Sequence, residues 1–498
     1  MSVGLQSARP RVASYASPRR AASAAAAYAA RLPLPLALII HLIIFGSLFS
    51  GLPGPAALGE LRGEGAVVGA LALVLWSAAS GALADVRGIR TALLYAPLLI
   101  CIALGFAANA DVISSSHFLG REGGEKFVAS LLVVALYLAA FFAICCEARI
   151  YGGLALLRCA GNAALWCGVL TLGEMATEVV SWFVPPIREA WMQVRGLWVS
   201  AGSSAPLFRL VGFAPEPSFG AISTMGLLGL LGCDWAIRGA SGELTPRRRR
   251  TLIIVIGALF ALELVLGNAR TFAISVFGAV LAGALTTSLA RRVPAALRSA
   301  ALLLLPLPAE ALLIWTVLRQ DAVARSASNI SRSVGMLTGG RIWADNPLLG
   351  VGLGQYGFHF RAWVPSWGLG SYEISRYFRD DQRDLLAGLP PSFSMFTRVG
   401  AELGLLGFLA WLLAPFIALR SGLLRAPSRL TTVIICALSA QIWVGLAFDS
   451  YRNIYYWWWL ALLLSWPPAS GRPQAGAPRY SAEHWNVRQP RRAPDGGR

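Results

Sequence analysis

Charged residues are scarce in this sequence. They make up 14% of its 498 residues, against about 25% in ordinary soluble domains, whereas 56% of the residues are hydrophobic and the mean hydropathy is +0.60. Lysine is almost missing: Lys126 is the only one, so arginine supplies nearly all of the 43 basic residues. This balance excludes a soluble domain and indicates a membrane protein that crosses the bilayer many times.

Residues that bind metals or form disulfides are also few. The seven cysteines all lie in apolar segments, without disulfide or metal-ligand spacing in a hydrophilic loop, so they are expected to be small buried residues. Three acids, Asp380, Asp381 and Asp384, are interleaved with arginines, which favours a solvated loop over a metal site. The sequence therefore predicts no metal and no other cofactor.

Apolar runs of about 20 residues, long enough to cross a bilayer, recur along the chain. We expect twelve spans, at residues 32–52, 66–84, 91–108, 127–146, 151–172, 219–238, 251–267, 271–290, 300–317, 399–419, 431–448 and 451–466. The predicted fold class is an all-α polytopic membrane protein with about twelve transmembrane helices.

The side on which each loop lies follows from arginine, because arginine-rich short loops stay in the cytoplasm. Counted from a cytoplasmic N-terminus, the main arginine clusters fall inside, and both ends, 1–31 and 467–498, become disordered cytoplasmic tails. Two long segments then lie outside: a loop at 173–218, within the first nine helices (32–317), and a large loop at 318–398, before helices 10 to 12 (399–466). Loops of such length are commonly functional.

Three arginines stand on the predicted outer side, where topology alone does not require them. Arg209 precedes the sixth span, Arg270 joins the seventh and eighth, and Arg341 lies in the large loop. Each can be an ordinary interfacial arginine. Together they favour a site for a lipid-linked phosphate or pyrophosphate, because a guanidinium matches phosphate oxygens with a planar fork of donors. Nearby glycine-rich backbone would add N–H donors for the same anion.

The motifs around these arginines resemble one family. Their order is R-x-x-G-F-x-x-E-P-S before a span, N-A-R-T between two spans, G-G-R-I-W-x-x-N-P-L-L-G-V-G-L-G-Q in the large loop and A-E-L-G-L-L-G-F at the next span. Over residues 208–411 the chain resembles the O-antigen polymerase and ligase superfamily. The resemblance implies a GT-C-like membrane glycosyltransferase that uses undecaprenyl-pyrophosphate-linked glycans at the outer face of the bacterial inner membrane.

The same resemblance implies roles for individual residues. Arg209, Arg270 and Arg341 match the family's arginines that hold pyrophosphate, and Glu402 matches the glutamate of its Glu-x-Gly-x-x-Gly motif. Apart from the resemblance, Glu216 stands between two prolines near Arg209 and is expected to orient that arginine, to take the proton of the acceptor, or to do both. The residues expected to bind substrate are Arg341, Trp343, Arg398 and Glu402. Phe393 stands where the ligases carry a histidine upstream of that glutamate, which favours a polymerase. The general base stays open among Glu216, His359 and Glu402.

The expected reaction moves a glycan from undecaprenyl pyrophosphate to an acceptor sugar hydroxyl. The expected partners are the lipid-linked oligosaccharide, membrane lipid and a chain-length regulator, and not nucleic acid. A ligase and a lipid-glycan flippase are the alternatives. A flippase would need ionisable residues through the membrane midplane, where the sequence has chiefly Arg158 and Glu310. Charges gather instead at the outer side, which favours chemistry at one face.

Overall fold

The structure is a computed structural model that describes residues 32–52, 61, 63–199, 210, 213–214, 216–267, 269–287, 289–319, 327–379, 389–425 and 428–465. The predicted cytoplasmic tails, 1–31 and 467–498, lie outside the described residues. All described residues belong to one compact unit.

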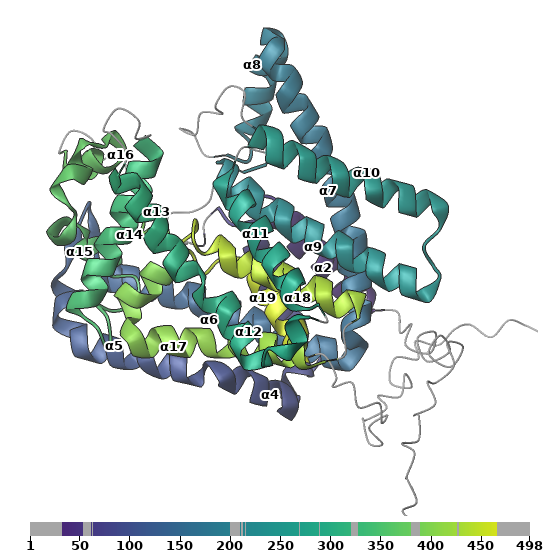
Figure 1. The fold of residues 1–498 in the computed structure, drawn as a ribbon, viewed down its shortest axis with the longest axis horizontal. Coiled ribbons are helices and arrows are strands. Elements are labelled where there is room, and N and C mark those ends of the chain that lie inside the picture. The colour runs from purple at the N-terminus through teal and green to yellow at the C-terminus, as the bar shows by residue number, and fades with distance from the viewer. Residues whose placement is uncertain are drawn as a thin grey trace, which may run out of the picture. The chain divides into compact units, whose positions relative to one another are not determined.

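Helices dominate the described chain (Figure 1). The α-helices are α2 (Leu34–Gly46), α3 (Ala66–Ala79), α4 (Val86–Ala92), α5 (Ala96–Ser115), α6 (Gly123–Glu147), α7 (Gly153–Phe183), α8 (Pro185–Arg195), α9 (Pro217–Ser241), α10 (Pro246–Leu262), α11 (Arg270–Leu285), α12 (Ala295–Leu304), α13 (Pro306–Arg319), α14 (Ala327–Asp345), α15 (Tyr356–Trp363), α16 (Tyr372–Ser375), α17 (Met395–Leu424), α18 (Arg429–Val444) and α19 (Ile454–Ser465).

Shorter elements connect these helices. There are two π-helices, η4 (Ala148–Gly152) and η5 (Glu263–Gly267), and five 3-10 turns, η2 (Ala82–Ala84), η3 (Leu93–Tyr95), η6 (Ala290–Arg292), η7 (Ser366–Gly370) and η8 (Arg376–Phe378), within the described ranges. Between α5 and α6, strands β1 (His117–Phe118) and β2 (Arg121–Glu122) form an antiparallel hairpin. Both residues of its turn have positive φ, as in the two-residue turns that suit the twist of a hairpin.

Apolar helices overlap each of the predicted spans, and the span 300–317 is divided between α12 and α13. In the described chain, six helical stretches are long and apolar enough to cross a membrane: Gly88–Ser115, Gly123–Phe183, Pro217–Ser241, Pro246–Gly267, Ala295–Arg319 and Met395–Leu424. The second of them joins α6 and α7 through η4. Helices α2, α3, α11, α18 and α19 are apolar but shorter. This is the architecture of a helical membrane protein, and the count of twelve crossings stays a prediction.

Helix α7 is longer than its predicted span. It continues past Leu172 to Phe183, so the first part of the predicted outer loop 173–218 is helical. The reason is that hydropathy marks where a span leaves the apolar layer, whereas Glu174, Met175 and Glu178 are residues that favour helix in water as well. Helix α8 follows and packs against α7.

The C-terminal helix α19 lies at the centre of the packing. Its sequence is apolar on every side, which is typical of a buried helix, and Trp457, Trp458 and Trp459 are at most 2% exposed. Helices α6, α17 and α18 pack around it. The first turn of α19 and the segment 445–453 before it are therefore held firmly against α17 and α18.

Helix α14, from the predicted large loop 318–398, packs along the start of α17. Figure 1 shows α14 beside α13, α15 and α16. Gly335 of α14 lies against Phe393, and a methyl group there would come within 2.8 Å of the Pro391 carbonyl oxygen. A larger residue would push the helix away from the turn at 389–394. The glycine thus lets α14 reach the turn that begins α17.

Candidate functional site

Two of the three predicted catalytic residues belong to the described chain. Glu216 precedes α9 as its N-cap residue, Arg270 is the first residue of α11, and both are exposed. Arg209 lies outside the described residues. Ala221 of α9 and Ala269, beside Arg270, share one buried cluster. The structure therefore brings the first turns of these two helices together.

Arg398 and Glu402, predicted to bind substrate, form a buried ion pair on α17. The Nε of Arg398 lies 3.0 Å from Oε1 of Glu402, whose side chain is 1% exposed. The Nη1 of Arg398 also donates to the carbonyl oxygen of Asp449 at 2.6 Å, and the guanidinium lies 5.5 Å from the centre of the Tyr451 ring. Glu402 thus orients the guanidinium of Arg398.

Arg341 and Trp343 lie further along α14. Arg341 is exposed and donates its Nη1 to the carbonyl oxygen of Trp363 at 3.2 Å. Trp343 packs on Gly400, and its ring centre lies 5.1 Å from that of Phe408. The Trp343 contacts hold α14 against α17, whereas the Arg341 bond joins α14 to α15. Both are packing roles.

The glycine-rich stretch after Arg341 docks on α17. The N–H of Val351 donates to the carbonyl of Ala401 at 3.0 Å, and the N–H of Gly352 donates to the carbonyl of Glu402 at 2.9 Å. Helix α17 is interrupted just beyond, where Gly404 adopts a φ of 64°, a conformation that favours glycine. Contrary to the sequence-based expectation, these two N–H groups satisfy the carbonyls of a broken helix and do not point at an anion.

Asp449, in the segment 445–453, was missed by sequence reasoning. Its Oδ2 accepts hydrogen bonds from the N–H of Ser392 at 2.7 Å, the hydroxyl of Ser392 at 3.0 Å and the N–H of Phe393 at 3.3 Å. Phe393 has a φ of 61°, a left-handed conformation that costs an L-residue about 1–2 kcal/mol. Such strain persists where surrounding contacts determine it, often at functional sites. The available signal was the polar run D-S-Y-R-N between two highly apolar spans.

Arg332 of α14, also missed, reaches the same place. Its Nη1 donates to the carbonyl of Ala447 at 3.3 Å, and its guanidinium lies 5.5 Å from the centre of the Phe393 ring. Arg332 and Arg398 therefore approach the segment 445–453 from two helices, and each donates to one of its carbonyls. Nothing in the sequence around Arg332 distinguishes it from other arginines of the large loop.

A third arginine, Arg452, belongs to the segment itself. Its Nε donates to the hydroxyl of Ser450 at 2.7 Å, and its Nη1 lies 3.4 Å from Oε1 of Glu64. Burial raises the pKa of the Glu64 carboxyl, and the Arg452 guanidinium opposes that shift. The arginine cluster consists of Arg332, Arg398 and Arg452.

Glu310 supports the same turn from α13. It is 7% exposed and accepts hydrogen bonds from the hydroxyls of Ser394, at 2.8 Å, and Thr397. Ser394 in turn caps α17 by accepting from the N–H of Thr397. Glu310, which the sequence placed near the midplane, therefore has a local role at the start of α17.

The arginine cluster is connected to the start of α9. Phe219, in the first turn after Glu216, packs edge-on against Phe448, with ring centres 5.3 Å apart. Phe448 directly precedes Asp449. The site thus combines the first turns of α9 and α17 with the segment 445–453.

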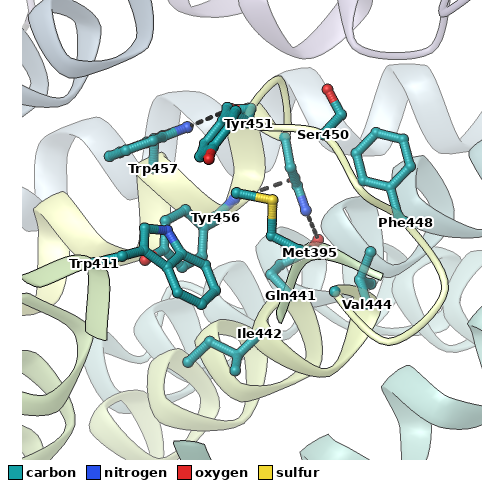
Figure 2. Close-up of a pocket in the computed structure, with 12 residues that line it drawn as sticks. Met395, Trp411, Gln441, Ile442, Val444, Phe448, Ser450, Tyr451, Tyr456 and Trp457 are labelled. Carbon is teal, nitrogen blue, oxygen red and sulfur yellow. Dashed lines mark hydrogen bonds between the residues drawn. The ribbon is translucent and has the colours of Figure 1, made fainter. Parts of the chain in front are cut away.

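A small pocket adjoins this site, between α17, α18 and α19 (Figure 2). Its volume is about 30 Å³, room for one water molecule or one small group. In Figure 2 the rings of Trp411 and Trp457 lie on one side and Phe448 on the other. Gln441 and Ser450 add polar atoms.

The described helices and this site define a helical membrane protein with a polar, arginine-rich centre at one end of its packed helices. No protein-family model, curated protein or solved structure matches the chain. In the part of the chain that the structure describes, no group of three or more histidines, cysteines and acids is placed to hold a metal ion. A functional proposal therefore rests on the site itself.

Proposed function

We propose that the protein is a polysaccharide polymerase of the bacterial inner membrane. It transfers a glycan from undecaprenyl pyrophosphate to a hydroxyl of an acceptor sugar at the outer face. The observation that carries the proposal is the arginine cluster around the segment 445–453, which the predicted topology puts outside, beside the helix that Glu216 begins. Guanidinium groups fixed in direction suit a lipid-linked pyrophosphate.

The chemistry follows from that placement. The oxygen of the acceptor hydroxyl attacks the anomeric carbon and forms a new C–O bond, while the bond from that carbon to the pyrophosphate oxygen breaks. The electron pair of that bond leaves with undecaprenyl pyrophosphate, which gains negative charge in the transition state. Preorganised guanidinium groups stabilise charge that develops in this way. Arg270 and Arg398 are the residues assigned to that role.

Glu216 is the base in this proposal. It is exposed, and its carboxylate does not cap α9 through a side-chain hydrogen bond. Pro217 directly follows Glu216 as the first residue of α9, and its ring fixes its own φ angle at a value that suits a helix. Glu216→Gln keeps the size and an acceptor but cannot take a proton. If Glu216 is the base, the glutamine and alanine variants both lose polymer formation, whereas a purely orienting role leaves the glutamine variant active.

Deletion of the gene, followed by gel analysis of surface polysaccharide, tests the proposal. A polymerase predicts loss of long polymer with single repeat units retained. Loss of every capped form indicates a ligase, and accumulation of repeat units inside the cell indicates a flippase. Complementation with wild type and with Arg398→Lys then assigns the activity to the site, because lysine keeps the charge but loses the planar fork.

A further inference from the structure

Two amide side chains meet at the small pocket beside the arginine cluster. Asn453 directly precedes α19, and its Oδ1 accepts a hydrogen bond from the N–H of Tyr456 at 3.3 Å, as an N-cap asparagine does. Because the N–H of Tyr456 binds the oxygen of this amide, the nitrogen is the atom that faces Gln441. The Nδ2 of Asn453 donates to Oε1 of Gln441 at 2.8 Å. The N-cap of α19 therefore determines which way the Gln441 amide points, a choice that the shape of an amide alone does not make.

The nitrogen of Gln441 is then left as a buried donor on a residue that lines the pocket. Gln441 is 3% exposed, it lines the pocket, and its Nε2 has no hydrogen-bond partner within the described residues. A buried donor without a partner destabilises a fold unless water or a ligand accepts from it. The pocket is thus prepared for a group that accepts a hydrogen bond.

The walls indicate the chemistry of that group. None of the pocket's lining residues carries a carboxylate, an ammonium or a guanidinium group, so an uncharged group fits. Trp411 and Tyr456 present stacked rings, with centres 6.4 Å apart and planes at 25°. Sugars combine hydroxyl oxygens with apolar C–H edges, which suits a pocket of aromatic rings and a few placed polar groups.

Tyr451 connects the pocket to the arginine cluster. Tyr451 lines the pocket, and the Arg398 guanidinium lies over its ring. A neutral, aromatic pocket and an arginine-rich centre are therefore adjacent. A lipid-linked glycan has the matching parts, a neutral sugar joined to an anionic pyrophosphate.

We propose that this pocket is a glycan subsite in which Gln441 Nε2 donates to an oxygen of one sugar substituent that enters beside Trp411 and Tyr456. This assignment rests on the proposed function and adds the sugar-recognising residue to it. The small volume admits one hydroxyl-bearing substituent, so the pocket selects sugars by that substituent and not by the whole ring. Gln441 acts in recognition and takes no part in bond making.

Asn453→Asp is the decisive variant, because it removes the donor without removing Gln441. Aspartate caps helices as well as asparagine does, so α19 keeps its N-cap bond. The second carboxylate oxygen can only accept, so the Gln441 amide turns its Nε2 toward it and presents Oε1 to the pocket. Gln441→Met, which removes the amide at similar size, is the second variant.

Ser439→Ala is the matched control. Ser439 is on the same helix, is fully buried, has an Oγ without a hydrogen-bond partner within the described chain and does not line the pocket. Replacing Ser439 by alanine removes a buried polar atom that also lacks a hydrogen-bond partner among the described residues, but away from the pocket. Thermal unfolding of all three variants reports whether they are folded, and Asn453→Asp carries the test if Gln441→Met fails to fold.

The probe is the oligosaccharide repeat unit released by mild acid from the surface polysaccharide of the organism that carries the gene. Binding to the purified full chain in nanodiscs is followed by intrinsic fluorescence, since Trp411 and Trp457 line the pocket. We expect saturable binding to wild type and to Ser439→Ala. In Asn453→Asp and Gln441→Met the affinity should fall by about tenfold, the factor that corresponds to one net hydrogen bond.

Wild-type affinity in Asn453→Asp, or no response of wild type to the released oligosaccharide, would overturn the subsite. The gene deletion reports separately on the proposed function. Loss of polymer on deletion, together with undiminished binding by Asn453→Asp, leaves a polymerase without this subsite. Unchanged polymer on deletion, together with binding that depends on Gln441, leaves a glycan site and removes the polymerase.

Discussion

Arginine has different partners at the two ends of the helices. At the predicted inner end, Asp234 is fully buried and accepts from Arg238 Nε at 2.7 Å through Oδ1 and from Arg248 Nη2 at 2.9 Å through Oδ2. Asn162 Oδ1 accepts from both arginines, at 3.1 and 2.7 Å. Both carboxylate oxygens and both guanidinium groups are thus joined in one network around Asp234.

At the predicted outer end the charged groups shape the backbone. Arg332 and Arg398 donate to carbonyls of the segment 445–453, and Asp449 accepts from the turn at Ser392 and Phe393. These carbonyls fix the direction of the two guanidinium groups, and Glu402 pairs with Arg398 at 3.0 Å while Glu64 pairs with Arg452 at 3.4 Å. The comparison separates two arrangements of the same residue types. At the inner end one buried carboxylate bridges two arginines, whereas at the outer end Arg398 and Arg452 each have a carboxylate of their own and Asp449 binds backbone.

The largest effect should come from opening the inner network. Asp234→Asn removes the buried carboxylate that joins Arg238 to Arg248, and breaking a buried ion pair costs about 3–5 kcal/mol. Chemical unfolding of the purified protein measures this change in the free energy of unfolding. Glu243→Gln is the comparison at the edge of the same network, because Glu243 reaches Arg238 at 3.7 Å and Arg158 at 3.0 Å but its side chain is 46% exposed, so its loss should cost less than about 1 kcal/mol. Equal effects of the two variants would contradict the central place of Asp234 in the inner network.

At the outer end the expected loss is in activity and not in stability. Arg270→Lys should reduce polymer formation about 10²- to 10³-fold, a change of about 3–4 kcal/mol in transition-state stabilisation, while the amount of protein in the membrane stays normal. Arg247→Lys is the matched change at an exposed arginine of the predicted inner end, and it should leave polymer formation unchanged. If both variants were fully active, the outer arginines would be ordinary surface residues.

A smaller effect concerns the strained turn that Asp449 holds. Because Phe393 has a left-handed φ, Phe393→Gly should be more stable than Phe393→Ala by about 1 kcal/mol. Comparing the two variants cancels the loss of the ring. The same pair of changes at Phe277, within α11, should have the opposite sign, since glycine weakens a helix relative to alanine. Thermal unfolding of the four variants gives the order, and alanine above glycine at residue 393 would contradict the strain.

The sequence was informative about what depends on local composition and uninformative about contacts between distant segments. Hydropathy located the apolar helices, and the motifs pointed to Glu216, Arg270, Arg398 and Glu402. The bonds from Asp449 to Ser392 and Phe393 join residues far apart in the chain, so no local pattern predicts them. The glycines near residue 352 illustrate the same limit, because their spacing suits an anion site and a docked loop equally. The hydrogen bonds to the backbone carbonyls of α17 decide in favour of the docked loop.

The smallest effect concerns Glu64, the partner of Arg452 in the outer site. Burial raises the pKa of this carboxyl above its ordinary value of 4.5, and Arg452 opposes the shift. The folded protein thus binds the proton more tightly than the unfolded chain, and the resulting stabilisation is present at pH values below 4.5 and is lost as the pH rises through the folded pKa.

Glu64→Gln does not titrate at this position. Its stability relative to wild type should therefore rise from acid to neutral pH, by less than about 1 kcal/mol, the size of one partly exposed ion pair. Thermal unfolding of both proteins over that range measures the difference, and the most acidic samples provide the reference at which the carboxyl is protonated. A difference that instead shrinks as the pH rises would mean that Arg452 outweighs burial. The ion pair between Glu64 and Arg452 would then stabilise the fold through its charges, as Asp234 does with its two arginines, and the two ends would not differ at this residue.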